Sequence, residues 1–427
     1  MTTDQRRSWL VATALFLMLV LSYSSAYLTM GIFFTPLIKN FGYSHARVSA
    51  LSTVAFLATA LFSWPAGWLL ERIDSRFLIS AGVVVIAAGF MTASQATHFG
   101  PLIAAYALMG AGVGLGTVIP AAVVVTNWFD KARGKAMAFV MSGTTFGGAL
   151  TAQLGNYLVH LGGLHFAYLG MIVPVLLSVP IVLLVVRTRP NSVTTQVQQQ
   201  HVTYPTSTPG YEVSEALLSR SFWMVILVTI CFGFVAASVA LHLAPFIIKL
   251  GYSANIAATA LSAFQISAGV TKLSLGALTD RRGVKISIVI AFLGGAVGAM
   301  SLVVSRHPSL LIIGILGMGM CLAPVSLIPL LLADSMGIRR FATLQGIQGF
   351  ILFLAVAAGP FIQGWLYDLS GSYVTSFHIL AVVAVVGALL TLTCKRYQRE
   401  QGAELTAPLA PAGSGTPATS YSAGPTR

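Results

Sequence analysis

Twelve apolar runs divide the chain, and each is long enough to cross a bilayer as one helix. About 20 apolar residues span the hydrocarbon core as an α-helix, whereas an open sheet edge would leave backbone groups unsatisfied in lipid. The sequence therefore predicts an all-α membrane protein with twelve transmembrane helices. They cover roughly residues 10–38, 47–70, 77–95, 101–127, 135–160, 164–186, 222–248, 255–279, 286–304, 309–333, 342–366 and 373–394.

The composition agrees with this class. Of the 427 residues, 56% are hydrophobic and 8% are charged, and the mean hydropathy is +0.85. Soluble domains carry about 25% charged residues. The first apolar run is much longer than the core of a signal peptide and lacks a small-residue cleavage site, so we expect it to remain as the first helix.

The apolar runs carry no motif for catalysis or cofactor binding. Cys231, Cys321 and Cys394 have no paired spacing, which argues against a disulfide framework or a zinc site. The glycine run at 110–116 lies inside a predicted helix with no strand before it, so close helix packing explains it better than a dinucleotide loop. We expect no cofactor, no metal and no enzymatic activity.

The positive charges indicate the cytoplasmic side. The net charge is +13. When the loops are assigned alternately to two sides, one side receives 19 Lys and Arg residues, and the other receives only Lys39, Arg47, Lys249 and Arg306. By the positive-inside rule, both termini are cytoplasmic. The excess of positive charge is thus a topology signal. We expect a multi-pass protein of the cell (plasma) membrane that contacts lipid and does not bind nucleic acid.

Two polar segments indicate the domain organisation. Residues 188–218 are rich in Pro, Thr and Gln, as in a flexible linker, and residues 401–427 hold too little apolar content to fold alone. We predict an N-terminal six-helix bundle over 1–187, a cytoplasmic linker over 188–220, a C-terminal six-helix bundle over 221–394 and a disordered cytoplasmic tail over 395–427.

The two halves repeat each other at an offset of 209 residues. TPLIKNFGYSHA in the first half matches APFIIKLGYSAN in the second, and the same offset pairs Glu71 with Asp280. A similar offset of 207 pairs Arg133 with Arg340. Each half begins and ends on the predicted cytoplasmic side, so the bundles are related by a pseudo-twofold axis along the membrane normal. Such symmetry is typical of two bundles that rock around a site at their interface.

Two charged loops occupy equivalent positions in the halves. GALTDRRGVK, residues 276–285, and its degraded copy GWLLERIDSR, residues 67–76, resemble the signature loop of the major facilitator superfamily. The resemblance covers nearly the whole chain and implies charge pairs that lock one face shut and reopen. The implied gating residues are Gly67, Glu71, Arg72, Gly276, Asp280, Arg281, Gly283 and Arg133. The alternative is that these charges only anchor the loops to lipid headgroups.

A closer resemblance involves the fifth, eighth and eleventh helices. NWFDKARGKAMAFVMSGTTFGG, residues 127–148, and QGIQGFILFLAVAAGPFIQGWLYD, residues 345–368, resemble segments of the monocarboxylate transporters and the related oxalate/formate antiporters. Lys272 falls where both groups carry an arginine thought to grip the substrate carboxylate. The resemblance implies that Lys272 holds an organic anion.

The sequence departs from those families at three positions. Ala268 replaces a carboxylate of the monocarboxylate pattern, and Leu28 replaces a lysine of the first helix. Leu352 stands where the oxalate group has a second cation. A single positive charge favours a monovalent anion over a dianion, and without an acidic residue in the apolar runs the proton route stays open.

Lys272 is the only charged side chain well inside an apolar run. An ionisable group in a membrane helix is a functional-site hypothesis by default. Gln265, Gly269 and Gly276 share its helix face, which suits a cavity wall. Snorkelling of the side chain to the interface is the alternative. Because a carboxylate binds the protonated amine, anion and proton would bind together, which gives symport from one side chain as a hypothesis.

Other polar side chains are candidates for substrate contact. His242 lies near the outer end of the seventh helix, where it would serve as a proton carrier. The remaining candidates are Tyr23 and Tyr27 on the first helix, Gln345 and Gln348 on the eleventh, and Gln153 and Asn156 on the fifth. Ordinary helix packing is the alternative for each. The predicted substrate-binding set is Lys272, Gln265, Tyr23, Tyr27, His242 and Gln348.

These features predict a secondary active transporter that works as a monomer. Its expected substrate is a small monocarboxylate anion, carried with a proton by rocker-switch alternating access. A multidrug or other organic-solute exporter of the same superfamily is the alternative, and dye efflux unaffected by carboxylates would support it.

Overall fold

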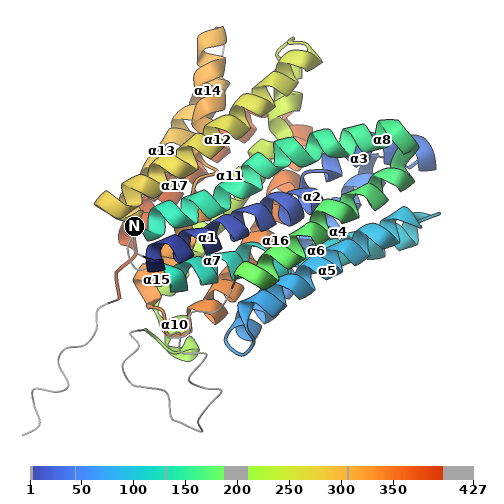
Figure 1. The fold of residues 1–427 in the computed structure, drawn as a ribbon. Helices are drawn as coiled ribbons and strands as arrows, with labels where there is room; N and C mark the ends of the chain where they lie inside the picture. Colours follow the sequence, from blue (N-terminus) through green and yellow to red (C-terminus); the bar gives the residue numbers. More distant parts are fainter. Residues whose placement is uncertain (1–2, 44, 130–131, 187–209, 305–306, 398–427) are drawn as a thin grey trace, which may run out of the picture. The chain divides into compact units, whose positions relative to one another are not determined.

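The computed structural model describes residues 3–43, 45–129, 132–186, 210–304 and 307–397. Figure 1 shows them as a set of long helices. The only β-type pairing in these ranges is one isolated bridge between Gly210 and Gly337. The predicted all-α class is confirmed.

The helices of the N-terminal half lie between residues 3 and 185. The first transmembrane helix is built from α1 (Thr3–Met18), the π-helix η1 (Leu19–Tyr23), α2 (Ser24–Tyr27) and α3 (Met30–Phe41). It is followed by α4 (His45–Leu70), α5 (Ser75–Ser94), α6 (Phe99–Gly116), α7 (Val118–Trp128) and α8 (Arg133–Val185).

The C-terminal half begins with a short helix, α10 (Val213–Leu218). The longer helices are α11 (Arg220–Lys249), α12 (Ala254–Arg282), α13 (Val284–Val303), α14 (Pro308–Met320), α15 (Pro324–Met336), α16 (Phe341–Ser370) and α17 (Tyr373–Thr393).

The predicted number of membrane spans agrees with these helices. Ten helical segments in the described ranges are long and apolar enough to cross a bilayer. One of them, α8, is 53 residues long and breaks at Gly162 and Gly163, whose backbone angles are not helical, so it supplies two spans. α12 is not among the ten, but its 29 residues exceed the length that a span requires. Together these segments give the twelve spans that the apolar runs predict.

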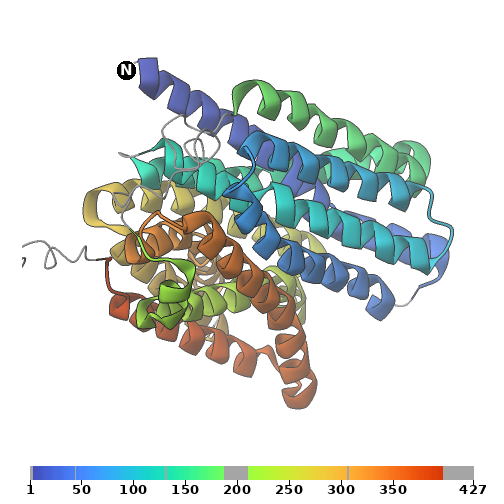
Figure 2. The ribbon, with the colours of Figure 1, turned by 90° about the horizontal axis from the view of Figure 1, so that it is seen from below.

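Two helix pairs make the most extensive contacts between the halves, and smaller contacts join α7 to α16 and α8 to α15. α4 packs against α16, and α8 packs against α12. Because α4 and α12 are equivalent in the 209-residue repeat, as are α8 and α16, the two contacts are related by the pseudo-twofold. Figure 2 shows the N-terminal helices, coloured blue to green, grouped beside the C-terminal helices, coloured yellow to red.

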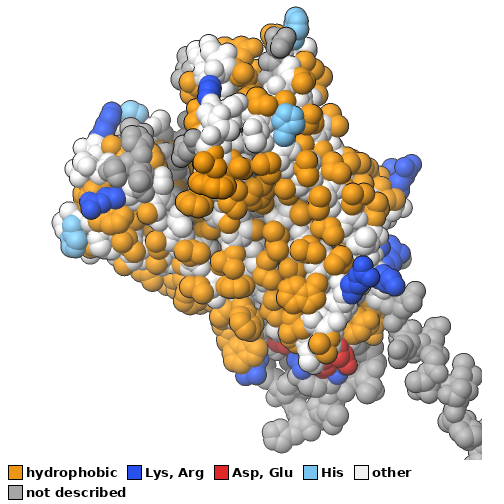
Figure 3. Space-filling model, turned by 180° about the vertical axis from the view of Figure 1, so that it is seen from behind, with side chains coloured by type: hydrophobic (Ala, Val, Ile, Leu, Met, Phe, Trp, Pro, Cys, Tyr) orange, Lys and Arg blue, Asp and Glu red, His pale blue; other side chains and the backbone are white. Residues whose placement is uncertain are grey.

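Apolar side chains cover the outside of these helices. Leu61, Leu150 and Val173 are 64%, 65% and 68% exposed. Figure 3 shows a face that is mostly hydrophobic, with Lys, Arg, Asp and Glu mostly toward its ends. Lipid tails solvate such a surface, so close packing has to hold the helices together. At Gly82 of α5, an added Cβ would lie 2.5 Å from Cα of Gly116 of α6, which shows how near the two backbones come.

The structure differs from the expected flexible linker at its C-terminal end. Residues 187–209 lie outside the described ranges, but α10 is a regular helix whose capping box pairs Glu212 with Glu215. The N–H of Tyr211 donates to the carbonyl of Met336 at 3.0 Å, and Glu212 pairs with Arg339 at 2.9 Å. Composition alone does not reveal these partners, because they come from a loop more than a hundred residues away.

The predicted disordered tail, 395–427, includes three residues, 395–397, that the structure describes. The N–H of Tyr397 donates to the carbonyl of Asp334 at 2.9 Å, and the ring of Tyr397 packs edge-on against Tyr211 at 5.0 Å. Residues 395–397 are therefore held against the end of α15. The rest of the predicted tail, 398–427, lies outside the described ranges.

Candidate functional site

Lys272 connects the two halves in the interior of the protein. Its side chain is 3% exposed, and its Nζ donates hydrogen bonds to Oγ1 of Thr144, at 3.2 Å, and of Thr145. Both threonines lie on α8, in the other half. The amine thus ends inside the bundle, about 12 Å along α12 from Asp280, and not at an interface where a snorkelling lysine would lie.

Thr144 and Thr145 were not among the predicted site residues. Thr144 also donates to the carbonyl of Met141 at 2.8 Å, which fixes its hydroxyl to accept from Lys272. Two adjacent hydroxyls in the middle of an apolar run were a signal in the sequence. Only the packing of α8 on α12 shows which cation they face.

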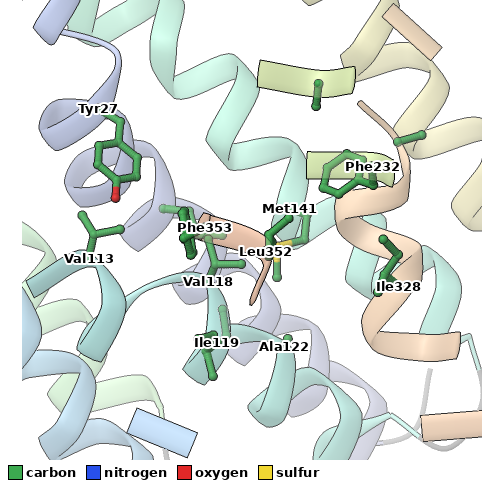
Figure 4. Packing of buried hydrophobic residues seen from close by; sticks show 14 of the residues in the cluster. Tyr27, Val113, Val118, Ile119, Ala122, Met141, Phe232, Ile328, Leu352 and Phe353 are labelled. Carbon is green, nitrogen blue, oxygen red and sulfur yellow. The ribbon is translucent and has the colours of Figure 1, made fainter. Parts of the chain in front are cut away.

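Apolar side chains of both halves belong to one buried cluster. Figure 4 shows part of it, with Met141 of α8 and with Leu352 and Phe353 of α16. Leu352 is 8% exposed, and its Cδ1 lies 3.2 Å from the Cβ position that Gly233 leaves empty. Hydrocarbon therefore fills the position where the oxalate/formate group has a second cation.

The first helix contains a π-helical segment at Tyr23. Such segments occur frequently at functional sites because they displace side chains from the regular helix faces. The rings of Tyr23 and Tyr27 pack edge-on, 5.2 Å apart. The hydroxyl of Tyr27 bonds that of Thr59 on α4, and its ring lies 6.3 Å from Phe353 of the other half. The two tyrosines therefore lie together, and Tyr27 lies at the contact between the halves.

Gln345 and Gln348 form a hydrogen-bonded chain within the C-terminal half. Nε2 of Gln345 donates to Oε1 of Gln348 at 2.7 Å, and Nε2 of Gln348 donates to Thr229 on α11 at 3.2 Å. Oε1 of Gln345 is buried without a hydrogen-bond partner in the described ranges. Gln348 thus links α16 to α11. Gln265 is partly buried, about 10 Å along α12 from Lys272.

His242 lies in a separate environment near the outer end of α11. Its Nε2 is 3.1 Å from the carbonyl of Pro360, and its ring lies 5.8 Å from that of Tyr373. A carbonyl only accepts, so Nε2 carries the hydrogen. The structure therefore places His242 in a contact among α11, α16 and α17 and not beside Lys272.

Asp280 closes one contact between the halves at the predicted cytoplasmic end. Its carboxylate accepts from the backbone N–H of Gly134 at 2.7 Å and of Lys135 at 3.1 Å. These N–H groups belong to the first turn of α8, where they have no partner within the helix. A carboxylate at a helix N-terminus is also favoured by the helix dipole.

Glu71 makes the equivalent contact in the other pair. Its carboxylate accepts from the N–H of Thr343 at 3.2 Å, from the hydroxyl of Thr343 at 2.7 Å and from Arg340 at 3.0 Å. Thr343 lies in the first turn of α16, and it is 209 positions after Gly134, as Asp280 is after Glu71. The repeat thus reproduces the whole contact of a carboxylate with a helix start.

Glycines allow both helix pairs to come this close. A Cβ at Gly67 would lie 2.3 Å from the carbonyl oxygen of Ala342, and a Cβ at Gly276 would lie 2.2 Å from Cβ of Ala138. Real Cβ atoms do not approach so closely, so each position needs glycine in this conformation.

The other predicted gating residues have further contacts in the described ranges. Arg72 lies over the ring of Trp68, 3.8 Å from its centroid, and Arg281 is exposed. Gly283 caps α12 with a φ of 91°, a conformation that favours glycine. Arg133 donates through Nε to the carbonyl of Phe129, in its own half. Among the predicted gating residues, Glu71, Asp280, Gly67 and Gly276 thus make the close contacts between the halves at these two helix starts.

The fold and these loops agree with comparisons to known proteins. The family model described as Major Facilitator Superfamily matches residues 15–352 and 243–418. The chain belongs to this superfamily. It is a multi-pass membrane transporter and not an enzyme.

Relatives of the chain confirm the closer resemblance. Mouse (Mus musculus) monocarboxylate transporter 12 is 24% identical over 430 residues, which cover 92% of this chain and 87% of that protein. The superfamily fold is also that of two solved structures. The proton:xylose symporter XylE has a TM-score of 0.70 at 16% identity, covering 92% of this chain and 97% of its own. The human organic anion transporter MFSD10 has a TM-score of 0.70 at 16% identity, covering 92% and 100%.

Proposed function

We propose that this chain is a secondary active transporter that carries a small monocarboxylate anion, together with a proton, by alternating access between its two halves. The supporting observation is Lys272, a cation 3% exposed in a membrane-spanning helix, whose hydrogen bonds go to two hydroxyls. Hydroxyls do not neutralise an ammonium, and a charge in lipid is costly without a partner. A bound carboxylate supplies that partner, and the names of the relatives favour the same substrate class.

The position of Lys272 connects substrate binding to the change of conformation. Its amine lies in one half, and the hydroxyls of Thr144 and Thr145 lie in the other. A carboxylate that accepts from the amine replaces these bonds and weakens the link at mid-membrane. Binding therefore favours a rearrangement of α8 against α12.

The two carboxylate contacts form the cytoplasmic gate in this proposal. They close α8 on α12 and α4 on α16 at the end that the positive-inside rule places in the cytoplasm. Opening toward the cytoplasm requires both to break, and their symmetry lets one rotation break both. Because both bundles belong to one chain, a monomer suffices for this cycle.

Purified protein in proteoliposomes tests the proposal. We expect uptake of one or more of acetate, lactate, pyruvate and benzoate, driven by an inward proton gradient and independent of membrane potential, since a monovalent anion with a proton carries no net charge. Energised dye efflux without carboxylate uptake would instead identify the alternative, an organic-solute exporter.

Lys272→Gln should abolish carboxylate binding, at a cost of about 2 to 5 kcal/mol, the scale for removing one partner of a buried charge pair. Lys272→Arg should keep partial activity, because guanidinium retains the charge with a different geometry. The control is Lys395→Gln, the same change at an exposed residue after α17. Uptake kinetics at matched expression measure the effect, and wild-type kinetics in Lys272→Gln would exclude the anion site.

A further inference from the structure

A cavity with a mixed polar and apolar lining lies at the predicted outer end of the N-terminal half, away from Lys272. It has a volume of about 740 Å³ and lies between α3 and α8. Its polar lining consists of Lys39 and Asn40 from α3 and of Gln153, Asn156 and His160 from α8. All five side chains are exposed, and none has a hydrogen bond or ion pair with another described residue. They are therefore available to a ligand.

The cavity lies on the helix face that leads to Lys272. Gln153, Asn156 and His160 follow Thr145 at spacings of 8, 11 and 15 residues, which keeps them on one side of α8. The inner part of this side packs on α12, where Phe146 is 3.1 Å from the Cβ position of Gly269. Its outer part is exposed. The polar face thus runs about 22 Å from His160 to the threonines that bind Lys272.

Polar side chains on this face require water. Exposed amides in contact with hydrocarbon would be left without hydrogen-bond partners, at a cost of several kcal/mol each. Gln153 lies nine residues inside the break at Gly162, about 14 Å from the outer end of its span. Water therefore enters along this face to a considerable depth.

Lys39 is the charged residue in the cavity lining. Lys39 supplies an ammonium, and the sequence contains no Asp or Glu between Asp4 and Glu71, between Asp74 and Asp130, or between Asp130 and Glu212. The outer connections of the N-terminal half are thus free of acidic residues. An unopposed cation in a watery recess attracts anions and raises their local concentration.

We propose that this cavity is an outer anion site that binds small carboxylates before they reach Lys272. The ammonium of Lys39 and the N–H groups of Asn40, Gln153 and Asn156 are donors that suit a carboxylate. The inference rests on the proposed function for the identity of its ligand. The attraction of anions itself does not depend on it.

The test uses charged thiol reagents and needs no transport. Asn156→Cys places a thiol in the cavity, while the native Cys231, Cys321 and Cys394 are buried. The rates of reaction are measured with anionic methanethiosulfonate ethylsulfonate and with the cationic trimethylammonium analogue. We expect Lys39→Gln to lower the anionic-to-cationic rate ratio about three- to tenfold, because the local field is lost. Protein without Asn156→Cys corrects for background.

Arg47→Gln is the matched control. Arg47 is a second cation at the same end, 5.8 Å from the ring of Phe99, and it does not line the cavity. We expect the rate ratio to stay within twofold of its starting value in Arg47→Gln, and acetate to slow the anionic reagent when Lys39 is present. An unchanged ratio in Lys39→Gln, or an equal fall in both variants, overturns the site.

Transport kinetics separate this inference from the proposed function. The comparison is made when wild-type protein takes up lactate into proteoliposomes. The Lys39→Gln variant should then show a KM for external lactate that is about three- to tenfold higher and an unchanged maximal rate, because only the capture of lactate is affected. An unchanged KM overturns the outer site and leaves the proposed function intact. If wild-type protein carries no carboxylate, the proposed function fails, and the thiol-reagent ratio still decides whether the cavity attracts anions.

Discussion

At the scale of single residues, the side chain that carries charge into the membrane-spanning helices differs from the residues that allow close helix packing. Lys272 brings the charge into the membrane, while Gly67 and Gly276 permit the backbone contact that closes the predicted cytoplasmic end. Leu352 is apolar at the position where the oxalate/formate antiporters have a second cation. A second cation there would favour a dianion. Under the proposed function, this composition favours a substrate with one negative charge.

The glycine contact gives a prediction for Gly67→Ala. A methyl group there meets the carbonyl oxygen of Ala342 at 2.3 Å and Cα of Gly346 at 2.8 Å, and neither is a flexible side chain. We expect the closed contact of α4 with α16 to weaken by about 1 to 3 kcal/mol, the usual cost of overpacking, and uptake to slow at least about tenfold.

Gly31→Ala is the control, because nothing lies within 4 Å of the Cβ it adds. Initial rates of uptake are compared at equal amounts of folded protein, measured by size-exclusion chromatography. Equal rates in the two variants would mean that the contact at Gly67 is dispensable.

At the scale of helices, the start of a helix in one half is bound by a carboxylate of the other. Arg340, just before α16, extends this arrangement, since it pairs with Glu71 at 3.0 Å and with Glu212 at 2.8 Å. Glu212 is the N-cap of α10. The start of α10 is thereby connected to the contact between the halves.

Asp280→Asn tests the helix contact. The variant keeps a side-chain oxygen but loses the charge that favours the N-terminus of α8, a change of about 1 kcal/mol. The population should shift about fivefold toward the form open to the cytoplasm, with substrate affinity within a few fold of wild type. Labelling of Ser63→Cys, at a buried position of α4, by an impermeant maleimide in inside-out vesicles measures the shift.

Asp74→Asn is the matched control, because Asp74 caps α5 within its own half through the N–H of Arg76 at 3.1 Å. It removes a charge from a helix start without touching the contact between the halves. Labelling that rises equally in both variants, or in neither, contradicts the gating role of Asp280.

At the scale of the whole molecule, one axis relates the two carboxylate contacts between the halves. The offset of 209 relates Glu71 to Asp280 and Gly134 to Thr343, so the pair α4–α16 and the pair α8–α12 are two copies of one contact. Equivalent contacts break together in a rotation about the axis between them. This geometry suits alternating access by movement of whole bundles.

The topology follows from the same arrangement and is testable with cysteines. Gln198→Cys lies in the predicted cytoplasmic linker, and Thr97→Cys is exposed between α5 and α6, on the predicted outer side. In intact cells, an impermeant maleimide should label Thr97→Cys and not Gln198→Cys, because positive loops stay in the cytoplasm. The reverse pattern would invert the orientation.

The sequence by itself determined the class, the twelve spans and the symmetry. Lipid leaves few choices: a run of about 20 apolar residues has to be a helix, and a repeated register has to give a repeated contact. The isolated charge of Lys272 and the two charged loops are also visible in the sequence, because each breaks an otherwise apolar or neutral pattern.

Only the tertiary structure decided which side chains meet. Thr144 and Thr145 lie 128 and 127 residues from Lys272, and Thr343 lies 272 residues from Glu71. It separated His242 from Lys272 and showed that Gly210, Tyr211 and Tyr397 contact the end of α15. The physical reason is that periodicity fixes the face of a helix, whereas its neighbour across that face depends on packing between distant segments.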